Sequence, residues 1–208
     1  MSVQDLLSAA KNAAPSVARA STTQKNAALR EISNELLANA EKIIAANAID
    51  LENGQKNSLS AGLLDRLKLD EPRIQALSQA IEEVISLPDP VGEDLEGKTL
   101  PNGLKLQKIR VPFGAIGCIY EARPNVTIDI AALAIKSSNA IVLRGGSAAE
   151  NTNRVLVQIL QSGLEKAGLD KNAAQTVDDF GRSGAQAMMQ ARGLIDVLIP
   201  RGSANLIR

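Results

Sequence analysis

The chain has 208 residues, 45% of them apolar and 22% charged, and its 23 basic and 23 acidic side chains give a net charge of zero. This composition supports a sizeable core, excludes a disordered tail, and argues against nucleic acid or a membrane surface as the main partner. The sequence has no histidine and one cysteine, Cys118, which excludes histidine-based triads, most zinc sites and disulfide scaffolds. Because there is neither a spanning apolar run nor a secretion signal, we expect a cytoplasmic protein.

Residues 1–93 show the three- and four-residue spacing of apolar side chains that is typical of helices. Ser21 and Gln24 have the spacing of a capping box at the start of one helix. We expect its apolar stripe to run through Leu29, Ile32, Leu36, Ala40 and Ile43.

Polar residues, a helix-capping residue and prolines indicate where the next loop and helix begin and end. The polar stretch 51–60 predicts a loop. Asp70 is a good N-cap residue, and Pro72 in the next turn can dispense with its N–H group. A helix is therefore expected from Asp70 onward, ending at Pro88.

A β element is expected between residues 94 and 112. Residues 91–103 are rich in glycine and acidic side chains and predict an exposed connection. Residues 104–111 alternate between apolar and polar side chains, with one slip at Gln107 and Lys108 that indicates a bulge. The pattern predicts a strand with one face in water, or an edge strand that pairs outside this chain.

The pattern then changes to short apolar runs of the kind found in buried parallel strands. These runs lie at 115–120, 140–143, 173–177 and 195–199, and helical spacing appears at 127–136 and 153–167. Gly168 is well placed to end the second of these helices. The alternation predicts an α/β fold, a doubly wound parallel sheet with helices on both faces.

In such a sheet, ligands bind beyond the carboxyl ends of the strands. After the run 115–120, Asn125 offers an amide that could stabilise a developing oxyanion, and Arg123 could hold a carboxylate or a phosphate. The alternative interpretation is a helix N-cap asparagine beside an exposed arginine.

Two turns that combine arginine, glycine and serine follow two other strands, so we expect them at one edge of the sheet. A helix N-terminus with free N–H groups, capped by Ser147 and Glu150, would favour a nucleotide phosphate there, although an ordinary strand-to-helix turn explains the residues equally well. The GxGxxG motif is absent. The turns contain Arg144, Gly145, Gly146 and Ser147 in the first, and Arg201, Gly202 and Ser203 in the second.

Cys118 lies inside the apolar run 115–120. Apolar surroundings raise the pKa of a thiol, and there is no histidine to activate it. We therefore interpret Cys118 as a core residue and not as a nucleophile.

Three segments closely resemble the gamma-glutamyl phosphate reductases, also called glutamate-5-semialdehyde dehydrogenases, which are a branch of the aldehyde dehydrogenase superfamily. The segments are 110–126 (RVPFGAIGCIYEARPNV), 136–146 (KSSNAIVLRGG) and 195–202 (IDVLIPRG). Similarity also at 46–51 and 63–67 extends the resemblance over essentially the whole chain, and the YEARPN and LRGG runs are specific for this branch.

The resemblance implies a Rossmann-like cofactor domain, a catalytic domain and a small β element for oligomerisation. It implies an enzyme that uses NADPH to reduce L-glutamyl 5-phosphate to L-glutamate 5-semialdehyde with release of phosphate, in proline biosynthesis. The implied partners are this substrate, further copies of the chain and, as a candidate, a glutamate 5-kinase. No metal is implied.

The resemblance also assigns roles to individual residues. Asn125 matches the asparagine of the oxyanion hole, Arg144 takes the place of a lysine near the adenosine ribose, and 201–203 match a turn that faces the cofactor. Arg144 favours NADPH over NADH, because a guanidinium can pair with a 2′-phosphate. Arg123 is expected to contact the substrate.

The family's nucleophilic cysteine lies in the second half of its chain, beyond the point that corresponds to Arg208. We therefore expect the N-terminal half of such an enzyme, with helices at 1–93, the oligomerisation element at 94–112 and a Rossmann-like NADP-binding region at 113–208, but no catalytic domain. One alternative is another aldehyde dehydrogenase, against which the EARPN run counts. The other is a non-catalytic nucleotide-binding or interaction fragment.

Overall fold

The computed structural model describes residues 1–202. Its centre is a four-stranded parallel sheet with the strand order β5-β4-β3-β6. The strands are β3 (Ala115–Tyr120), β4 (Ala140–Arg144), β5 (Ala174–Thr176) and β6 (Val197–Arg201). Each overlaps one of the four apolar runs, and the predicted α/β fold is confirmed.

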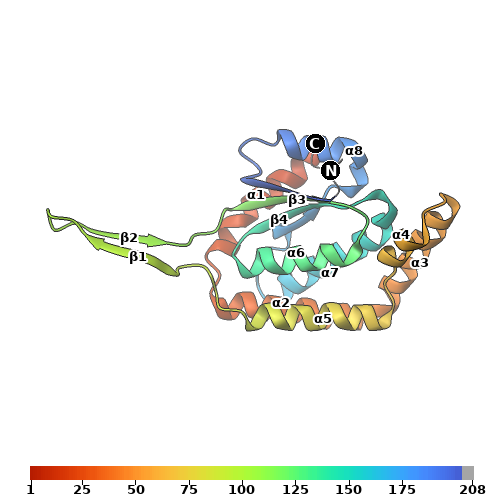
Figure 1. Ribbon diagram of the computed structural model, residues 1–208, viewed down its shortest axis with the longest axis horizontal. Helices are drawn as coiled ribbons and strands as arrows, with labels where there is room; N and C mark the ends of the chain where they lie inside the picture. The colour runs from red at the N-terminus through yellow and green to blue at the C-terminus, as the bar shows by residue number, and fades with distance from the viewer. Residues whose placement is uncertain (203–208) are drawn as a thin grey trace.

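Helices cover both faces of the sheet (Figure 1). One face carries α6 (Pro124–Lys136) and α7 (Glu150–Lys166), with α2 (Thr22–Ala38) and α5 (Glu71–Ser86) stacked outside them. The opposite face carries α1 (Val3–Ala18) and α8 (Gly181–Gln190). Because side chains alternate along a strand, Cys118 and Tyr120 enter the larger core with α6 and α7, whereas Ile119 enters the smaller core with α1 and α8.

The start signals of the N-terminal helices are confirmed, but one predicted helix is two. Ser21 caps α2, its hydroxyl accepting the N–H of Gln24 at 3.2 Å. Asp70 caps α5 by accepting the N–H of Arg73 at 3.1 Å. The predicted apolar stripe is divided at Asn39, where α2 ends and α3 (Ala40–Lys56) begins.

The loop predicted at 51–60 is wrong over its first half, because α3 continues to Lys56 before a turn leads into α4 (Ala61–Leu67). Polar side chains suit this end of α3, much of which is exposed, and Glu52 and Lys56 form an ion pair one turn apart at 2.7 Å. Polarity at 51–56 therefore reflects solvent exposure and not a break in the helix.

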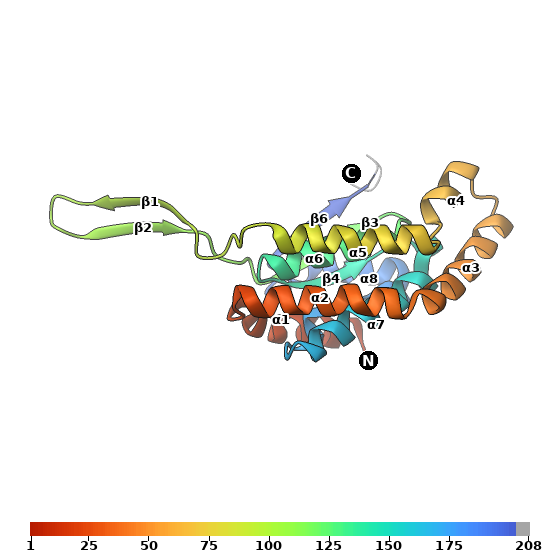
Figure 2. The same ribbon diagram turned by 90° about the horizontal axis from the view of Figure 1, so that it is seen from below.

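Residues 91–110 contain an exposed β-hairpin in place of the predicted connection and unpaired strand. β1 (Asp94–Thr99) pairs antiparallel with β2 (Lys105–Ile109), and every side chain of both strands is exposed. The bulge predicted at Gln107 and Lys108 is wrong: both residues pair regularly, and the register shift lies on β1, between Asp94 and Glu96. Figures 1 and 2 show the hairpin projecting away from the sheet and helices. Strand β1 was not predicted, because Leu95 is its only large apolar residue and no apolar alternation marks it in the sequence.

Two buried lysines hold α2, α5 and α6 together. The Lys25 side chain is 1% exposed, and its Nζ lies 2.7 Å from a carboxylate oxygen of Asp89 and 2.8 Å from the Ser138 hydroxyl. Lys136 donates to the carbonyl of Ile85 at 2.8 Å, and burial lowers its pKa. These bonds fix the chain that leaves α5 for the hairpin. Within the described residues, no helix is both long and apolar enough to cross a membrane.

Candidate functional site at the carboxyl edge of the sheet

A cavity of about 420 Å³ opens at the carboxyl ends of β3 and β4, on the face covered by α8. We call it the α8-side cavity. Arg144 is in register with Ile119, so its side chain lies on this face of the sheet. The cavity is lined, among others, by Ile119, Ala122, Arg144, Ser147, Arg182 and Met189. Three residues of the first predicted turn, Arg144, Gly146 and Ser147, thus meet at one cavity.

A buried chain of hydrogen bonds fixes the turn after β4. Asp178 accepts the backbone N–H of Gly145 at 2.7 Å and the side-chain amide of Asn153 at 3.0 Å. Asn153 in turn accepts from the Thr127 hydroxyl at 2.9 Å, which lies 2.6 Å from the Tyr120 hydroxyl. Burial raises the pKa of Tyr120 and raises the pKa of Asp178 to about 6. The network therefore fixes the position of the turn, and burial of the Asp178 carboxylate disfavours its charged form.

The two glycines of this turn are required by the protein's own packing. A Cβ on Gly145 would lie 2.1 Å from the amide nitrogen of Asn153. A Cβ on Gly146 would lie 2.6 Å from the backbone nitrogen of Ala122, in the loop after β3. The close backbone approach expected for a ligand is thus made between two loops of the protein itself.

The free helix N-terminus expected after the turn is wrong. Ser147 opens a short 3-10 turn (Ser147–Ala149), and α7 begins at Glu150 without a side-chain cap from its own segment. Asp50 of α3 instead accepts the N–H of Thr152 at 2.8 Å and that of Asn151 at 3.2 Å. A buried carboxylate already satisfies this helix end, so a phosphate placed there would meet a like charge. The capping box of Ser147 and Glu150 is absent, because α7 begins at Glu150 and Ala149 holds its N-cap position.

The second predicted turn lies at the same edge of the sheet, but its arginine extends to the opposite face. Arg201 is in register with Tyr120, one residue after the partner of Arg144, so the two arginines extend to opposite sides of the sheet. Arg201 and Gly202 are exposed. Ser203 lies outside the described residues.

A second cavity, of about 410 Å³, lies on the α6 face between α4, α5 and α6, and we call it the α6-side cavity. Asn125 and Arg123 both line it, which separates them from Arg144. Asn125 is not the N-cap of α6, since Arg123 holds that position. Its side-chain amide donates to Asp129 one turn later, at 3.1 Å. The amide therefore faces the cavity from a fixed position.

Cys118 is fully buried in β3, and burial raises the pKa of its thiol to about 11. A thiol in this state is protonated at neutral pH and shielded from substrate. This confirms the interpretation of Cys118 as a core residue. Among the described residues, no group of cysteine and acidic side chains could hold a metal ion.

Sequence reasoning missed Arg182, which enters the α8-side cavity from the start of α8. The sequence signal was weak, because a 3-10 turn (Asp178–Phe180) separates Arg182 from the end of the short strand β5. Because β5 spans only Ala174–Thr176, its carboxyl end was not recognised as part of the site.

Comparison with known proteins agrees with this geometry. Residues 1–206 match the model of the aldehyde dehydrogenase family. A gamma-glutamyl phosphate reductase of Leifsonia xyli is 60% identical over 100% of this chain and 49% of its own length, and one of Clavibacter michiganensis is 55% identical over 99% and 48%. The chain therefore spans about half the length of the curated relatives it matches.

Solved structures show the same similarity. A gamma-glutamyl phosphate reductase of Thermotoga maritima superposes with a TM-score of 0.95 at 36% identity, over 99% of this chain and 50% of its own. That of Saccharomyces cerevisiae gives 0.91 at 31%, over 100% and 53%. An acetylating aldehyde dehydrogenase of Geobacillus thermoglucosidasius, at 17% identity and a TM-score of 0.75 over 99% and 42%, shares the fold. The sheet, its flanking helices and the match over residues 1–206 together show that this chain belongs to the aldehyde dehydrogenase family.

Proposed function

We propose that this chain is the cofactor-binding half of an enzyme that reduces L-glutamyl 5-phosphate to L-glutamate 5-semialdehyde with NADPH and releases phosphate. The similarity to reductases of that name over the whole chain supports the reaction. Membership of the aldehyde dehydrogenase family implies a nicotinamide cofactor. The observation that carries the choice of NADPH is that two guanidinium groups, those of Arg144 and Arg182, line one cavity at the carboxyl edge of the sheet.

The residues present fit a phosphorylated nucleotide. A phosphate in the α8-side cavity would accept hydrogen bonds from Arg144 and Arg182, which present planar donor sets suited to phosphate oxygens. The Ser147 hydroxyl lines the same cavity. Ligands of parallel sheets bind at this edge. When bound there, the cofactor would supply the hydride of the reaction.

In this proposal, the cofactor and the substrate bind on opposite faces of the sheet at its carboxyl edge. The α8 face holds the cofactor through Arg144, and the α6 face presents Asn125 to the reacting carbonyl. A thiolate from the other half of the enzyme would displace phosphate from the acyl carbon, and the bound cofactor would supply the hydride that reduces this carbon to the aldehyde. Asn125 would donate to the carbonyl oxygen as negative charge develops on it. Arg123 lines the same cavity and would contact the anionic substrate.

The test uses an enzyme of full length, in which residues 1–208 are joined to the unmatched half of the Leifsonia xyli relative. Oxidation of glutamate 5-semialdehyde in the presence of phosphate is measured with NADP⁺ and with NAD⁺. Loss of a hydrogen bond to a charged group costs roughly 10–100-fold, so Arg144→Met should raise the KM for NADP⁺ by about that factor and leave the KM for NAD⁺ nearly unchanged. Arg192→Met, which removes an exposed arginine outside the cavity, is the matched control. Equal use of both cofactors, unaffected by Arg144→Met, would contradict the assignment.

Residues 1–208 alone should not catalyse the reaction. The sequence holds one thiol, Cys118, and that side chain is buried with a raised pKa. Turnover by this segment that Cys118→Ser abolishes would overturn the assignment of catalysis to the other half. The proposal also places the enzyme in the cytoplasm, after a kinase that phosphorylates the 5-carboxylate of glutamate.

A further inference from the structure

We propose that Asp178 is a positioning residue for the cofactor: it holds Arg144 and Arg182 in one arrangement, in which both guanidinium groups can bind the same phosphate. The inference rests on the proposed function and deepens it, because it names what sets the geometry of the phosphate site. The phosphate concerned is the 2′-phosphate that distinguishes NADPH from NADH. Asp178 itself is not among the residues that line the α8-side cavity, so it acts through the two arginines.

The two arginines of this cavity belong to different segments of the chain. Arg144 is the last residue of β4, and Arg182 is the second residue of α8, with α7 and β5 between them in sequence. A flexible side chain that must be ordered by its ligand loses conformational entropy on binding, which weakens the complex. A phosphate held by both guanidinium groups therefore requires that the protein fix the end of β4 against the start of α8.

Asp178 makes this connection. It is the first residue of the 3-10 turn that leads directly into α8. Its carboxylate accepts the N–H of Gly145, the residue after Arg144, at 2.7 Å, and the side-chain amide of Asn153 of α7 at 3.0 Å. One carboxylate thus joins the segment that carries Arg182 to the segment that carries Arg144, and anchors both to α7.

Arg144 also contacts the start of α8. Its Nε donates to the carbonyl of Gly181, the residue before Arg182, at 3.4 Å. Gly181 has a φ of 54°, a conformation that favours glycine. The bond engages Nε and leaves the two terminal nitrogens to bind a phosphate. The position of the turn before α8, which Asp178 fixes, therefore sets the orientation of both guanidinium groups.

The negative charge of Asp178 does not account for its place beside the cavity. Burial raises the pKa of its carboxylate to about 6, so the charged form is disfavoured but still prevails at neutral pH. A negative side chain close to a phosphate weakens binding of that phosphate. Charge and position thus have opposite effects on the binding of NADP⁺, and substitutions can separate them.

The experiment measures the Kd for NADP⁺ and for NAD⁺ by titration calorimetry of the full-length chimera at pH 7. Asp178→Ala removes both the charge and the acceptor of the Gly145 N–H. It should raise the Kd for NADP⁺ roughly tenfold, as expected when one hydrogen bond to a charged group is lost, and change the Kd for NAD⁺ less. The kcat at saturating NADP⁺ should stay within about twofold. Asp178→Asn keeps an acceptor for Gly145 without the charge, so it should bind NADP⁺ at least as tightly as the wild type.

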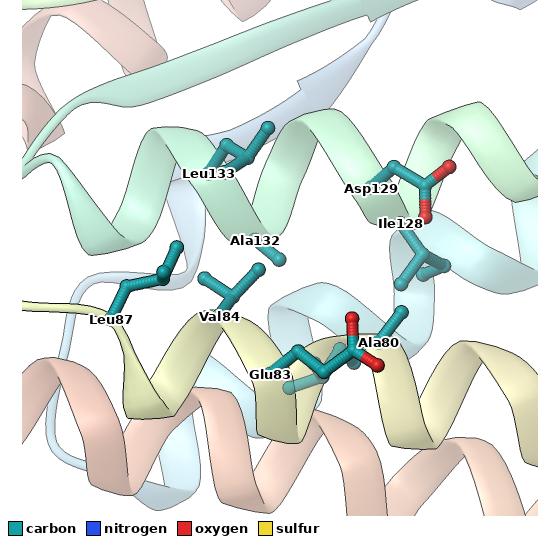
Figure 3. Close-up of a pocket in the computed structure, with 9 residues that line it drawn as sticks. Ala80, Glu83, Val84, Leu87, Ile128, Asp129, Ala132 and Leu133 are labelled. Carbon is teal, nitrogen blue, oxygen red and sulfur yellow. The ribbon is translucent and has the colours of Figure 1, made fainter.

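Two controls remove a carboxylate elsewhere. Asp179→Ala changes the next residue of the same turn, whose exposed carboxylate pairs with Arg154 and not with the turn after β4. Figure 3 shows Glu83 in the groove between α5 and α6, on the face of the sheet opposite α8, and Glu83→Gln changes that position. Both variants should keep the Kd for NADP⁺ within about twofold of the wild type.

A double-mutant cycle tests whether Asp178 acts through the arginines. Arg182→Met should weaken NADP⁺ binding in the wild type, and its effect should be smaller in Asp178→Ala, because residues that act through one another are not additive. Fully additive effects would overturn the proposal. Equal NADP⁺ affinity of Asp178→Ala and Asp178→Asn would overturn it too, as would a loss of kcat at unchanged Kd.

The remaining outcomes separate this inference from the proposed function. If Asp178→Ala does not fold, as judged by its melting, Asp178→Leu fills the space without the hydrogen bonds and should show the same loss of NADP⁺ affinity. If Arg144→Met and Arg182→Met both leave NADP⁺ binding unchanged, the proposed cofactor site is refuted. If they weaken it while Asp178→Ala does not, this inference alone is refuted.

Discussion

The buried carboxylate of Asp178 should make the stability of this protein fall as the pH rises from about 4 to about 6. Its ordinary pKa is 3.8, and burial raises the pKa to about 6 in the folded state. The folded state therefore holds the proton more tightly than the unfolded chain does. As the pH increases through this window, the unfolded chain loses the proton first, and the free energy of unfolding decreases. The full cost is present above pH 6.

The size of the effect follows from the two pKa values. One pKa unit corresponds to about 1.4 kcal/mol, so the difference between 3.8 and about 6 amounts to about 3 kcal/mol. Asp178→Asn removes the titration. Its amide oxygen can still accept the N–H of Gly145, and its NH₂ group can donate to Asn153. The bonds between Asn153 and Thr127 and between Thr127 and Tyr120 can then reverse direction, because each of these side chains can both donate and accept.

The assay is urea denaturation of the wild type and of Asp178→Asn at pH 4 and pH 7. The unfolding free energy of the variant minus that of the wild type should increase by about 2.4 kcal/mol between the two pH values, because the unfolded chain is already partly ionised at pH 4. Any constant cost of the amide cancels in this comparison. Asp179→Asn, which changes the neighbouring, exposed carboxylate that pairs with Arg154 at 2.7 Å, is the control for the loss of a nearby acidic side chain. A pH-independent difference for Asp178→Asn would refute the reasoning.

Three further results are expected. Asn125→Ala should lower turnover of the full-length chimera by roughly 10²–10³ and barely change its melting temperature, because Asn125 does not cap α6; normal turnover would contradict the oxyanion role. Lys25→Met should lower the unfolding free energy by about 3–5 kcal/mol, since it leaves the carboxylate of Asp89 without its buried partner, and Asp89→Leu in the same chain should restore part of the loss in urea titrations. Leu106→Lys with Ile109→Lys should reduce the oligomer measured by light scattering, because these exposed apolar side chains of β2 lie on the projecting hairpin; a wild type that is monomeric at micromolar concentration would show that the hairpin does not join subunits.

Local sequence determined the elements whose signals lie within a few residues of one another. The apolar run at 115–120 became β3, Ser21 capped α2, and Asp70 capped α5. Gly168 ends α7 with a positive φ of 74°. Each of these elements depends on a run of buried side chains or on a capping residue within one turn. Both signals can be recognised from neighbouring residues in the sequence. The α/β class followed from them.

Only the tertiary structure decided which polar groups meet. Asp50 caps α7 from about 100 positions away in sequence, and no local spacing predicts such a partner. Arg144 and Arg201 look alike in sequence, yet a register difference of one residue along β3 sends them to opposite faces of the sheet. Hydrophobic periodicity specifies which side of an element is buried, whereas the partner of a polar side chain depends on which distant segment packs beside it. The sequence therefore indicated the edge at which the site lies, and packing divided that edge into two cavities.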